Sequence, residues 1–173
     1  MMAVASAEQT EGDFAHLVRE NQAMVFSLAY HFLHDRALAE EVAQEVFLAL
    51  YRNLGSIQSS AHAAFWLRKA ALRRLIDEAR RRKRRPQVTL EEVAEPAAGI
   101  RERDPMLSAV LRRLVASLPE TPRAVMVLRY QEDLDPSDIA EMLDMPVGTV
   151  KSHLQRSLAL LREKLERRGV GEP

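Results

Sequence analysis

Residues 119–156 carry the pattern that most constrains the fold, two short helices separated by a break. Asp135 and Pro136 mark the start of the first helix, because aspartate caps helices and proline at the first helical position has no amide left to satisfy. A break follows at residues 144–146, and a second helix is predicted to start near Val147. Helical spacing places five apolar residues on its inner side: Val150, Leu154, Leu158, Leu161 and Leu165. The pattern predicts a helix-turn-helix.

The second helix of this pair is predicted to present polar and basic residues outward. Lysine, arginine, serine and glutamine are the side chains that hydrogen-bond base edges and phosphates in a major groove. Six residues are therefore candidates for reading duplex DNA: Thr149, Lys151, Ser152, His153, Gln155 and Arg156. The alternative interpretation is a small three-helix bundle with a solvated basic face.

The composition favours an all-α protein. The 173 residues include only six glycines, and β-branched residues almost never alternate with polar ones, which argues against a sheet. The chain has no cysteine, which excludes a disulfide framework and a thiolate metal site. No apolar run approaches membrane-spanning length, and the N-terminus lacks the layout of a signal peptide. We therefore expect a soluble, cytoplasmic protein without membrane insertion.

The formal net charge of zero hides a segregation of charge into blocks. Residues 65–85 carry ten Lys or Arg against two acids, whereas residues 129–145 carry six acids and one Arg. Residues 35–45 are acidic, with four acids and one Arg, and residues 151–168 are basic, with six bases and two acids. Alternating blocks of this kind indicate two basic surfaces that face DNA and acidic surfaces that meet something else.

Apolar residues at helical spacing predict two small helical domains joined by a flexible acidic linker. The first domain contains three helices, and the third of these ends in the basic run of residues 80–85. The linker has no sustained period, is rich in alanine and glutamate, and is bracketed by prolines. The predicted segments are a disordered N-terminal tail (1–12), the first domain (13–86), the linker (87–105), the second domain (106–168) and a C-terminal tail (169–173).

The first domain carries its own signal for nucleic-acid binding. Phe65 and Trp66 end a polar loop and are followed by a basic stripe. Aromatic residues beside a cationic groove suit single-stranded nucleic acid, because stacking tolerates any base and the backbone supplies the negative charge. Two alternatives remain open: at least one of these aromatic residues is a core anchor, and the basic run 80–85 is a solvated helix end.

Three segments, in this order, resemble a bacterial RNA polymerase sigma factor of the extracytoplasmic-function (ECF) class. They are DRALAEEVAQEVFLALYRNL (35–54), FWLRKAALRRLIDEARRRKRR (65–85) and LPETPRAVMVLRYQEDLDPSDIAEMLDMPVGTVKSHLQR (119–156). The first is similar to sigma region 2.2, the second to regions 2.3 and 2.4, and the third to region 4. The string PVGTVKS at 146–152 is highly specific. The chain departs from the family at Asp144, where relatives commonly have glycine.

The resemblance implies a function for each domain. Residues 13–86 would grip the β′ clamp of the core RNA polymerase and open the minus-ten element of promoter DNA. Residues 106–168 would read the minus-thirty-five element and dock on the β flap. The linker would thread the polymerase toward the RNA exit channel. The implied partners are the core enzyme, promoter DNA and an anti-sigma factor.

The same resemblance assigns residues to two further surfaces. The acidic and apolar segment of region 2.2 supplies the expected polymerase contacts: Asp35, Glu41, Gln44, Glu45 and Phe47. The loop that follows is expected to capture an unstacked minus-ten base, while basic side chains hold the strand backbone. The expected minus-ten contacts are Asn53, Ser59, His62, Trp66, Lys69, Arg73, Arg74 and Arg80.

The residues give catalysis little support. The five histidines share no metal-ligand spacing with carboxylates, and there is no glycine-rich phosphate loop or nucleophile elbow. We therefore expect no enzymatic activity, no metal and no cofactor. The alternative function is a stand-alone helix-turn-helix regulator that dimerises through its N-terminal helices. In that protein, residues 35–54 would pair with a second copy rather than with a polymerase clamp.

Overall fold

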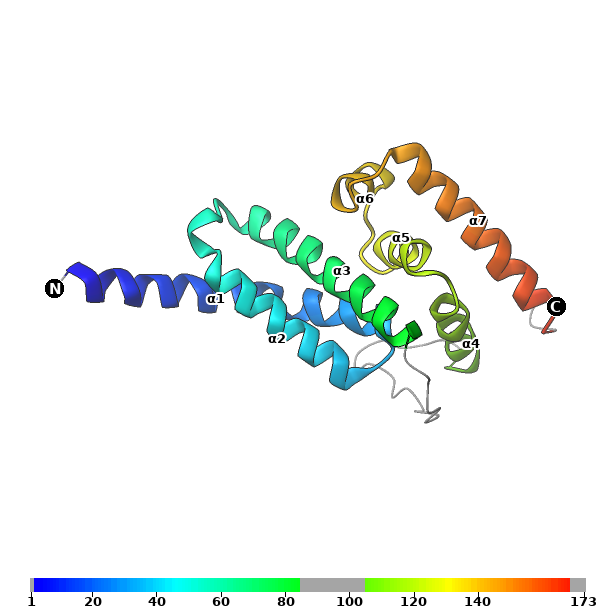
Figure 1. Cartoon of the computed structure of the whole chain (residues 1–173), viewed down its shortest axis with the longest axis horizontal. Coiled ribbons are helices and arrows are strands. Elements are labelled where there is room, and N and C mark those ends of the chain that lie inside the picture. The colour runs from blue at the N-terminus through cyan, green and yellow to red at the C-terminus, as the bar shows by residue number, and fades with distance from the viewer. Residues whose placement is uncertain (1, 85–104, 169–173) are drawn as a thin grey trace.

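The computed structural model describes residues 2–84 and 105–168, and all regular structure within them is helical. The first domain comprises α1 (Met2–Leu33), α2 (Arg36–Arg52), the short η1 (Leu54–Ser56) and α3 (Ser60–Arg84) (Figure 1). The second comprises α4 (Pro105–Ala116), α5 (Glu120–Tyr130), α6 (Pro136–Met142) and α7 (Val147–Glu166). The prediction of an all-α fold is confirmed. The predicted linker, 87–105, lies almost wholly outside the described residues.

The N-terminal segment differs from the prediction. Helix α1 begins at Met2, so residues 2–12 are helical where a disordered tail was predicted. The physical reason is local composition: this segment is rich in Ala, Glu, Gln and Met, which have high helix propensity. These residues are continuous with the rest of α1, which ends at Leu33.

Helices α1, α2 and α3 form a three-helix bundle around a fully buried core. Each helix contributes apolar residues from one face, as the helical period requires. The completely buried side chains include Leu28, Phe32, Val46, Leu50, Leu67 and Leu75. Among the described residues, no helix is long and apolar enough to span a bilayer.

Two residues, His34 and Asp35, connect α1 to α2. Asp35 caps α2, its Oδ1 accepting a hydrogen bond from the Leu38 amide at 3.0 Å. His34 precedes it with a φ of 52°, a left-handed conformation that few residues adopt. Neither ring nitrogen of His34 has a hydrogen-bond partner among the described residues. Burial, together with the nearby charges of His31, Arg112 and Arg123, lowers the pKa of His34 from 6.5 to about 4.

This pKa predicts a loss of stability in mild acid. Between pH 6.5 and about 4, the unfolded chain takes up a proton on His34 but the folded chain does not. The free energy of unfolding therefore decreases as the pH is lowered through this range. The loss for this residue amounts to about 3 kcal/mol when the whole window is crossed. Urea unfolding at pH 7.5 and pH 4.5 measures it.

His34→Asn provides the matched comparison, since asparagine does not titrate and tolerates the left-handed backbone. The pH dependence of the free energy of unfolding should be shallower in this variant than in the parent protein. Equal slopes for the two proteins would contradict the assignment.

Helices α6 and α7 form the predicted helix-turn-helix, packed on α5. Asp135 occupies the N-cap position of α6 with Pro136 at the start of the helix, as the sequence indicates, but the Asp135 side chain makes no capping hydrogen bond. Asp144 makes the turn with a φ of 52°, a conformation that aspartate tolerates better than most residues. Val150 is fully buried and fixes the rotation of α7. Leu158 was predicted to face inward but is 40% exposed, because it borders an open groove between α4, α5 and α7.

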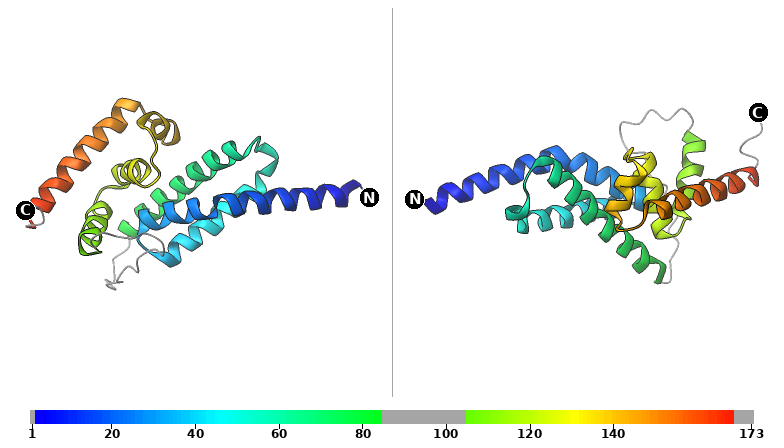
Figure 2. Two further views of the ribbon diagram at one scale, coloured as in Figure 1. Left: turned by 180° about the vertical axis from the view of Figure 1, so that it is seen from behind. Right: turned by 90° about the horizontal axis from the view of Figure 1, so that it is seen from above.

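The two domains pack against each other. Helix α5 contacts both α1 and α3, and α6 contacts α3, as the views in Figures 1 and 2 show. One apolar core runs through the bundle and into α5, α6 and α7. At the contact with α1, the Arg123 guanidinium lies 5.1 Å from the centroid of the Phe32 ring and donates to the Phe32 carbonyl at 3.4 Å. The bundle therefore presents its α3 face toward the helix-turn-helix.

Candidate nucleic-acid interface

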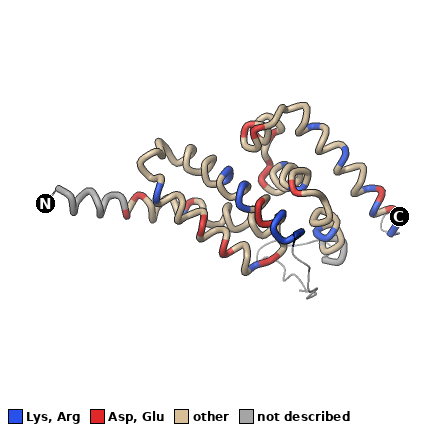
Figure 3. Tube along the Cα trace, in the orientation of Figure 1, with Lys and Arg blue, Asp and Glu red and all other residues tan. Residues whose placement is uncertain are grey.

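Basic residues gather along the second half of α3 (Figure 3). Lys69 and Arg73 are one helical turn apart, and Arg80 follows two turns later on the same side. Arg73 and Arg80 are exposed, and Lys69 is half-buried. His62 and Trp66 precede them along this side at the same helical spacing. Five of the eight predicted minus-ten residues thus share one face.

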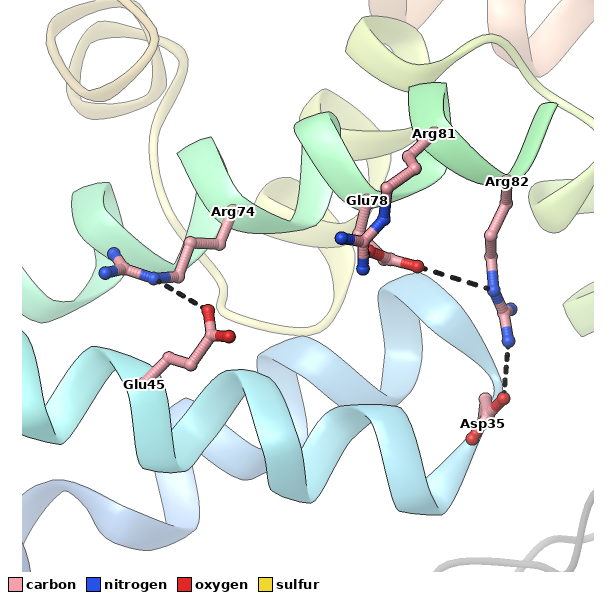
Figure 4. A network of polar contacts seen from close by, with 6 residues as sticks. All are labelled: Asp35, Glu45, Arg74, Glu78, Arg81 and Arg82. Carbon is pink, nitrogen blue, oxygen red and sulfur yellow. Dashed lines mark hydrogen bonds and ion pairs between the residues drawn. The ribbon is translucent and has the colours of Figure 1, made fainter. Parts of the chain in front are cut away.

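Arg74 lies on a different side of α3 and faces α2 (Figure 4). Its Nε donates to Glu45 Oε2 at 3.2 Å. Arg82 likewise donates to Asp35 at 2.6 Å, and Glu78 pairs with both Arg81 and Arg82. Part of the basic run therefore joins α3 to α2. Asp35, Glu45 and Arg74 each have a structural contact that is independent of any partner.

The predicted loop residues make local hydrogen bonds. Asn53 Nδ2 donates to the Ala49 carbonyl at 2.7 Å. The amide of His62 donates to Ser59 Oγ at 3.1 Å, and His62 Nδ1 accepts from the Gln58 amide at 3.2 Å. These bonds shape the turn between α2 and α3. Since all of the groups concerned lie at an exposed turn, the same geometry also presents a polar rim beside α3.

Trp66 and Phe65 are both half-buried and pack against the core of the bundle. The interpretation of these aromatic residues as core anchors therefore has direct support. Trp66 keeps part of its ring surface outside the core, on the side of α3 that carries Lys69. It can contribute a partial stacking surface, but not a fully exposed one.

Four of the six predicted residues on α7 are exposed: Thr149, Lys151, Gln155 and Arg156. Ser152 and His153 are half-buried, and Ser152 Oγ donates to the Gly148 carbonyl at 2.9 Å. Thr149 is exposed in the first turn of the helix. The exposed residues with long side chains are therefore the ones positioned to reach base edges.

Helix α2 exposes two large apolar residues that were not among the predicted polymerase contacts. Leu48 is 56% exposed and Tyr51 is 48% exposed. Beside them, a groove of about 820 Å³ between α1 and α2 is lined by apolar residues that include Phe14, Phe26 and the predicted Phe47. Glu41 and Gln44, also predicted, are exposed on the same helix. The sequence contains a signal that could have identified this surface, because Leu48 and Tyr51 are large apolar residues outside the inward-facing positions of an amphipathic helix.

A second apolar groove, of about 600 Å³, opens between α4, α5 and α7. Leu111, Leu158 and Leu165 are among its lining residues, and the first two are exposed. Arg112, Arg162 and His31 also line it. Exposed leucines in a concave surface are typical of a protein-binding site. No cluster of three or more His, Asp or Glu able to hold a metal exists among the described residues.

Both domains match known families. Residues 17–85 match Sigma-70 region 2, and residues 108–161 match Sigma-70, region 4. The fold and its surfaces thus define a protein built from these two regions.

Curated relatives extend the similarity over most of the chain. The ECF RNA polymerase sigma factor SigW of Bacillus subtilis is 32% identical over 167 residues, which cover 88% of this chain and 88% of the relative. The RNA polymerase sigma-H factor of Pseudomonas aeruginosa is 31% identical over 166 residues, covering 88% and 86%. The chain belongs to the ECF RNA polymerase sigma factors. A stand-alone regulator is not favoured.

A solved structure shares the fold. The sigma factor RpoE of Bartonella quintana, crystallised in complex with the anti-sigma factor NepR, superposes with a TM-score of 0.72 at 20% identity. The similarity covers 89% of this chain and 97% of that one. At this identity the comparison supports the fold of both domains.

Proposed function

We propose that this chain directs core RNA polymerase to specific promoters and helps to melt them. The observation that carries the proposal is the presence, on one chain, of a helix-turn-helix with exposed Lys151, Gln155 and Arg156, a basic α3 face, and an exposed apolar surface on α2. The first surface suits duplex DNA, the second suits a single strand, and the third suits a protein partner.

The α2 surface is proposed to bind the β′ clamp. Leu48, Tyr51 and the neighbouring groove supply the apolar centre of an interface, and Glu41 and Gln44 supply its polar rim. The groove between α4, α5 and α7 is proposed to accept an apolar element of the β flap. Two separated protein contacts would hold the DNA-binding surfaces at two places along a promoter.

Each basic surface is assigned one promoter element. The α3 face with Lys69, Arg73 and Arg80 would hold the backbone of the melted minus-ten strand. Arg156 and Gln155 would read base edges of the minus-thirty-five element, since arginine pairs with guanine and glutamine with adenine. We assign polymerisation chemistry to the core enzyme and a non-catalytic, cytoplasmic role to this chain. An anti-sigma factor is proposed as a further partner, as in the RpoE complex.

Reconstituted transcription tests the proposal. Core polymerase with the purified chain should produce a promoter-dependent transcript, and core polymerase alone should not. Arg156→Ala and Gln155→Ala should each relax the preference at particular minus-thirty-five base pairs by about 1–3 kcal/mol, the value of one bidentate contact. A promoter library with single base-pair changes measures this preference.

The outcomes separate the possible roles. If the chain fails to co-purify with core polymerase and yields no transcript, the proposed function is wrong. If the two variants weaken transcription evenly from all promoters, Gln155 and Arg156 contact phosphates and do not read bases.

A further inference from the structure

The groove between α4, α5 and α7 also receives the end of α1. His31 and His34 of α1 line it together with residues of the three other helices. Helices α4, α5 and α7 contact one another in every pairing, and α1 contacts both α4 and α5 (Figures 1 and 2). The groove volume of about 600 Å³ is typical of sites for small molecules, which occur preferentially between domains. The groove is therefore large enough to hold a ligand of its own.

The wall supplied by α7 suits a linear apolar chain. Leu158, Leu161 and Leu165 share one side of the helix and line the groove, so they form a strip about 10 Å long. Leu111 of α4 lines the same groove and is 38% exposed, and Leu158 is 40% exposed. Apolar side chains left exposed in a concave surface gain free energy when a ligand covers them. The strip is aliphatic, which favours a hydrocarbon chain.

The charged groups that line the groove are all basic within residues 2–84 and 105–168. Arg112 and Arg162 line it with the two histidines, and no Asp or Glu does. Burial is the main cause of the lowered pKa of His34, and the electrostatic effects of His31 and Arg112 add to it, so these three groups lie close together. Positive groups gathered in a concave, partly desolvated surface attract an anion more strongly than they would in water.

His34 has unused hydrogen-bonding capacity beside the groove. Both of its ring nitrogens are buried, and neither has a partner among the described residues. A neutral imidazole has one N–H donor, and a buried donor without an acceptor costs free energy. A ligand oxygen beside the ring would supply the acceptor. Since a carboxylate is both an anion and a hydrogen-bond acceptor, it matches the basic lining and the unpaired imidazole together.

We propose that this groove binds a free, single-chain carboxylic acid of medium length, of the class of fatty acids. Its carboxylate would lie beside His31, His34 and Arg112, and its chain would cover the leucine strip of α7. The groove has room for one such chain and not for a bilayer surface. The bound acid would also compete with the β flap for the same groove, and this consequence alone rests on the proposed function.

Calorimetric titration of the free, full-length chain with decanoate tests the site in the absence of polymerase and DNA. One equivalent of decanoate should bind saturably. Decanol has the same chain length but no charge, and it should bind about tenfold or more weakly, because a hydrogen bond to a charged group contributes more than a neutral one. Octanoate should bind more weakly than decanoate, by up to about fourfold for each methylene removed.

Two pairs of variants locate the site. Leu158→Glu places a carboxylate on the leucine strip and should weaken decanoate binding about tenfold or more, whereas Leu160→Glu, exposed on the same helix outside the groove, should bind as the parent does. Arg162→Gln should weaken the binding of decanoate but not of decanol. Arg113→Gln is its control, since Arg113 is exposed on α4 outside the groove, and it should change neither affinity.

Nuclear magnetic resonance of the histidine side chains provides an independent reading. The imidazole signals of His31 and His34 should shift when decanoate binds. Those of His16 should not, because His16 is exposed on α1 about 20 Å from His31 along the helix. Urea unfolding shows whether Leu158→Glu is folded. If it is not, Arg162→Gln, at an exposed position, decides the question together with these signals.

Four results would overturn the proposal. They are no saturable binding at millimolar decanoate, equal affinities for decanoate and decanol, equal losses in Leu158→Glu and Leu160→Glu, and histidine signals that do not shift. Binding to vesicles of anionic phospholipid without binding of decanoate would identify a membrane surface instead, and would also overturn it. Failure of the chain to bind core polymerase would refute the proposed function and leave the titrations standing.

Discussion

Replacing Leu48 with glutamate is expected to weaken the binding of the chain to core RNA polymerase about 30- to 700-fold. Leu48 is 56% exposed beside an apolar groove, so the change costs little in the free protein. In the interface, a charge would replace a large apolar contact, and residues at the centre of interfaces contribute about 2–4 kcal/mol each. Titration of labelled chain with core enzyme measures the dissociation constant.

Leu160→Glu serves as the control for this experiment. Leu160 is 37% exposed on α7 and does not line either apolar groove, so its replacement should leave core binding unchanged. Unfolding curves of both variants should match the parent protein. Equal affinity of Leu48→Glu and the parent would exclude the α2 surface as the clamp contact.

The helices were predictable because their signals are local. Pro136 starts α6 at a position where its missing amide costs nothing, with Asp135 in the N-cap position before it, and the pattern around Val150 sets the rotation of α7. The helical state of residues 2–12 was missed, although propensity alone indicates it. The exposure of Leu158 could not be predicted, because it depends on how α4 and α5 are arranged beside α7.

The charge and residue types of the candidate sites could be predicted from the sequence, but the ion pairs between particular residues could not. The basic character of residues 65–85 is visible in the sequence, yet nothing in the spacing shows that Arg74 would face Glu45 while Arg73 would face Asp144. Long-range ion pairs depend on which faces two distant helices present to each other. The sequence did indicate that the acidic blocks contact a surface other than DNA. Part of that surface is α3 of the same chain.

Replacing Lys69 and Arg73 together with alanine is expected to slow open-complex formation about 10- to 100-fold while core binding is unchanged. Each side chain would otherwise make a charge-assisted bond to the melted strand, worth about 1 kcal/mol or more, and 1.4 kcal/mol corresponds to a tenfold change in rate. The salt dependence should change as well. For the isolated single strand, the slope of log affinity against log salt should become shallower by about 0.7 for each lost contact.

Arg74→Ala is the matched control, since Arg74 is the neighbour of Arg73 in sequence but donates to Glu45 on α2. Its loss should lower the stability of the bundle slightly, by about 1 kcal/mol or less for a partly exposed pair, and should leave strand binding intact. Permanganate reactivity of the melted region and oligonucleotide anisotropy distinguish the variants. Arg74→Ala could instead reduce melting as much as the double variant does. In that case the face of α3 toward α2 would contact the strand. The side of the helix that carries Lys69, Arg73 and Arg80 would then be only a solvated surface.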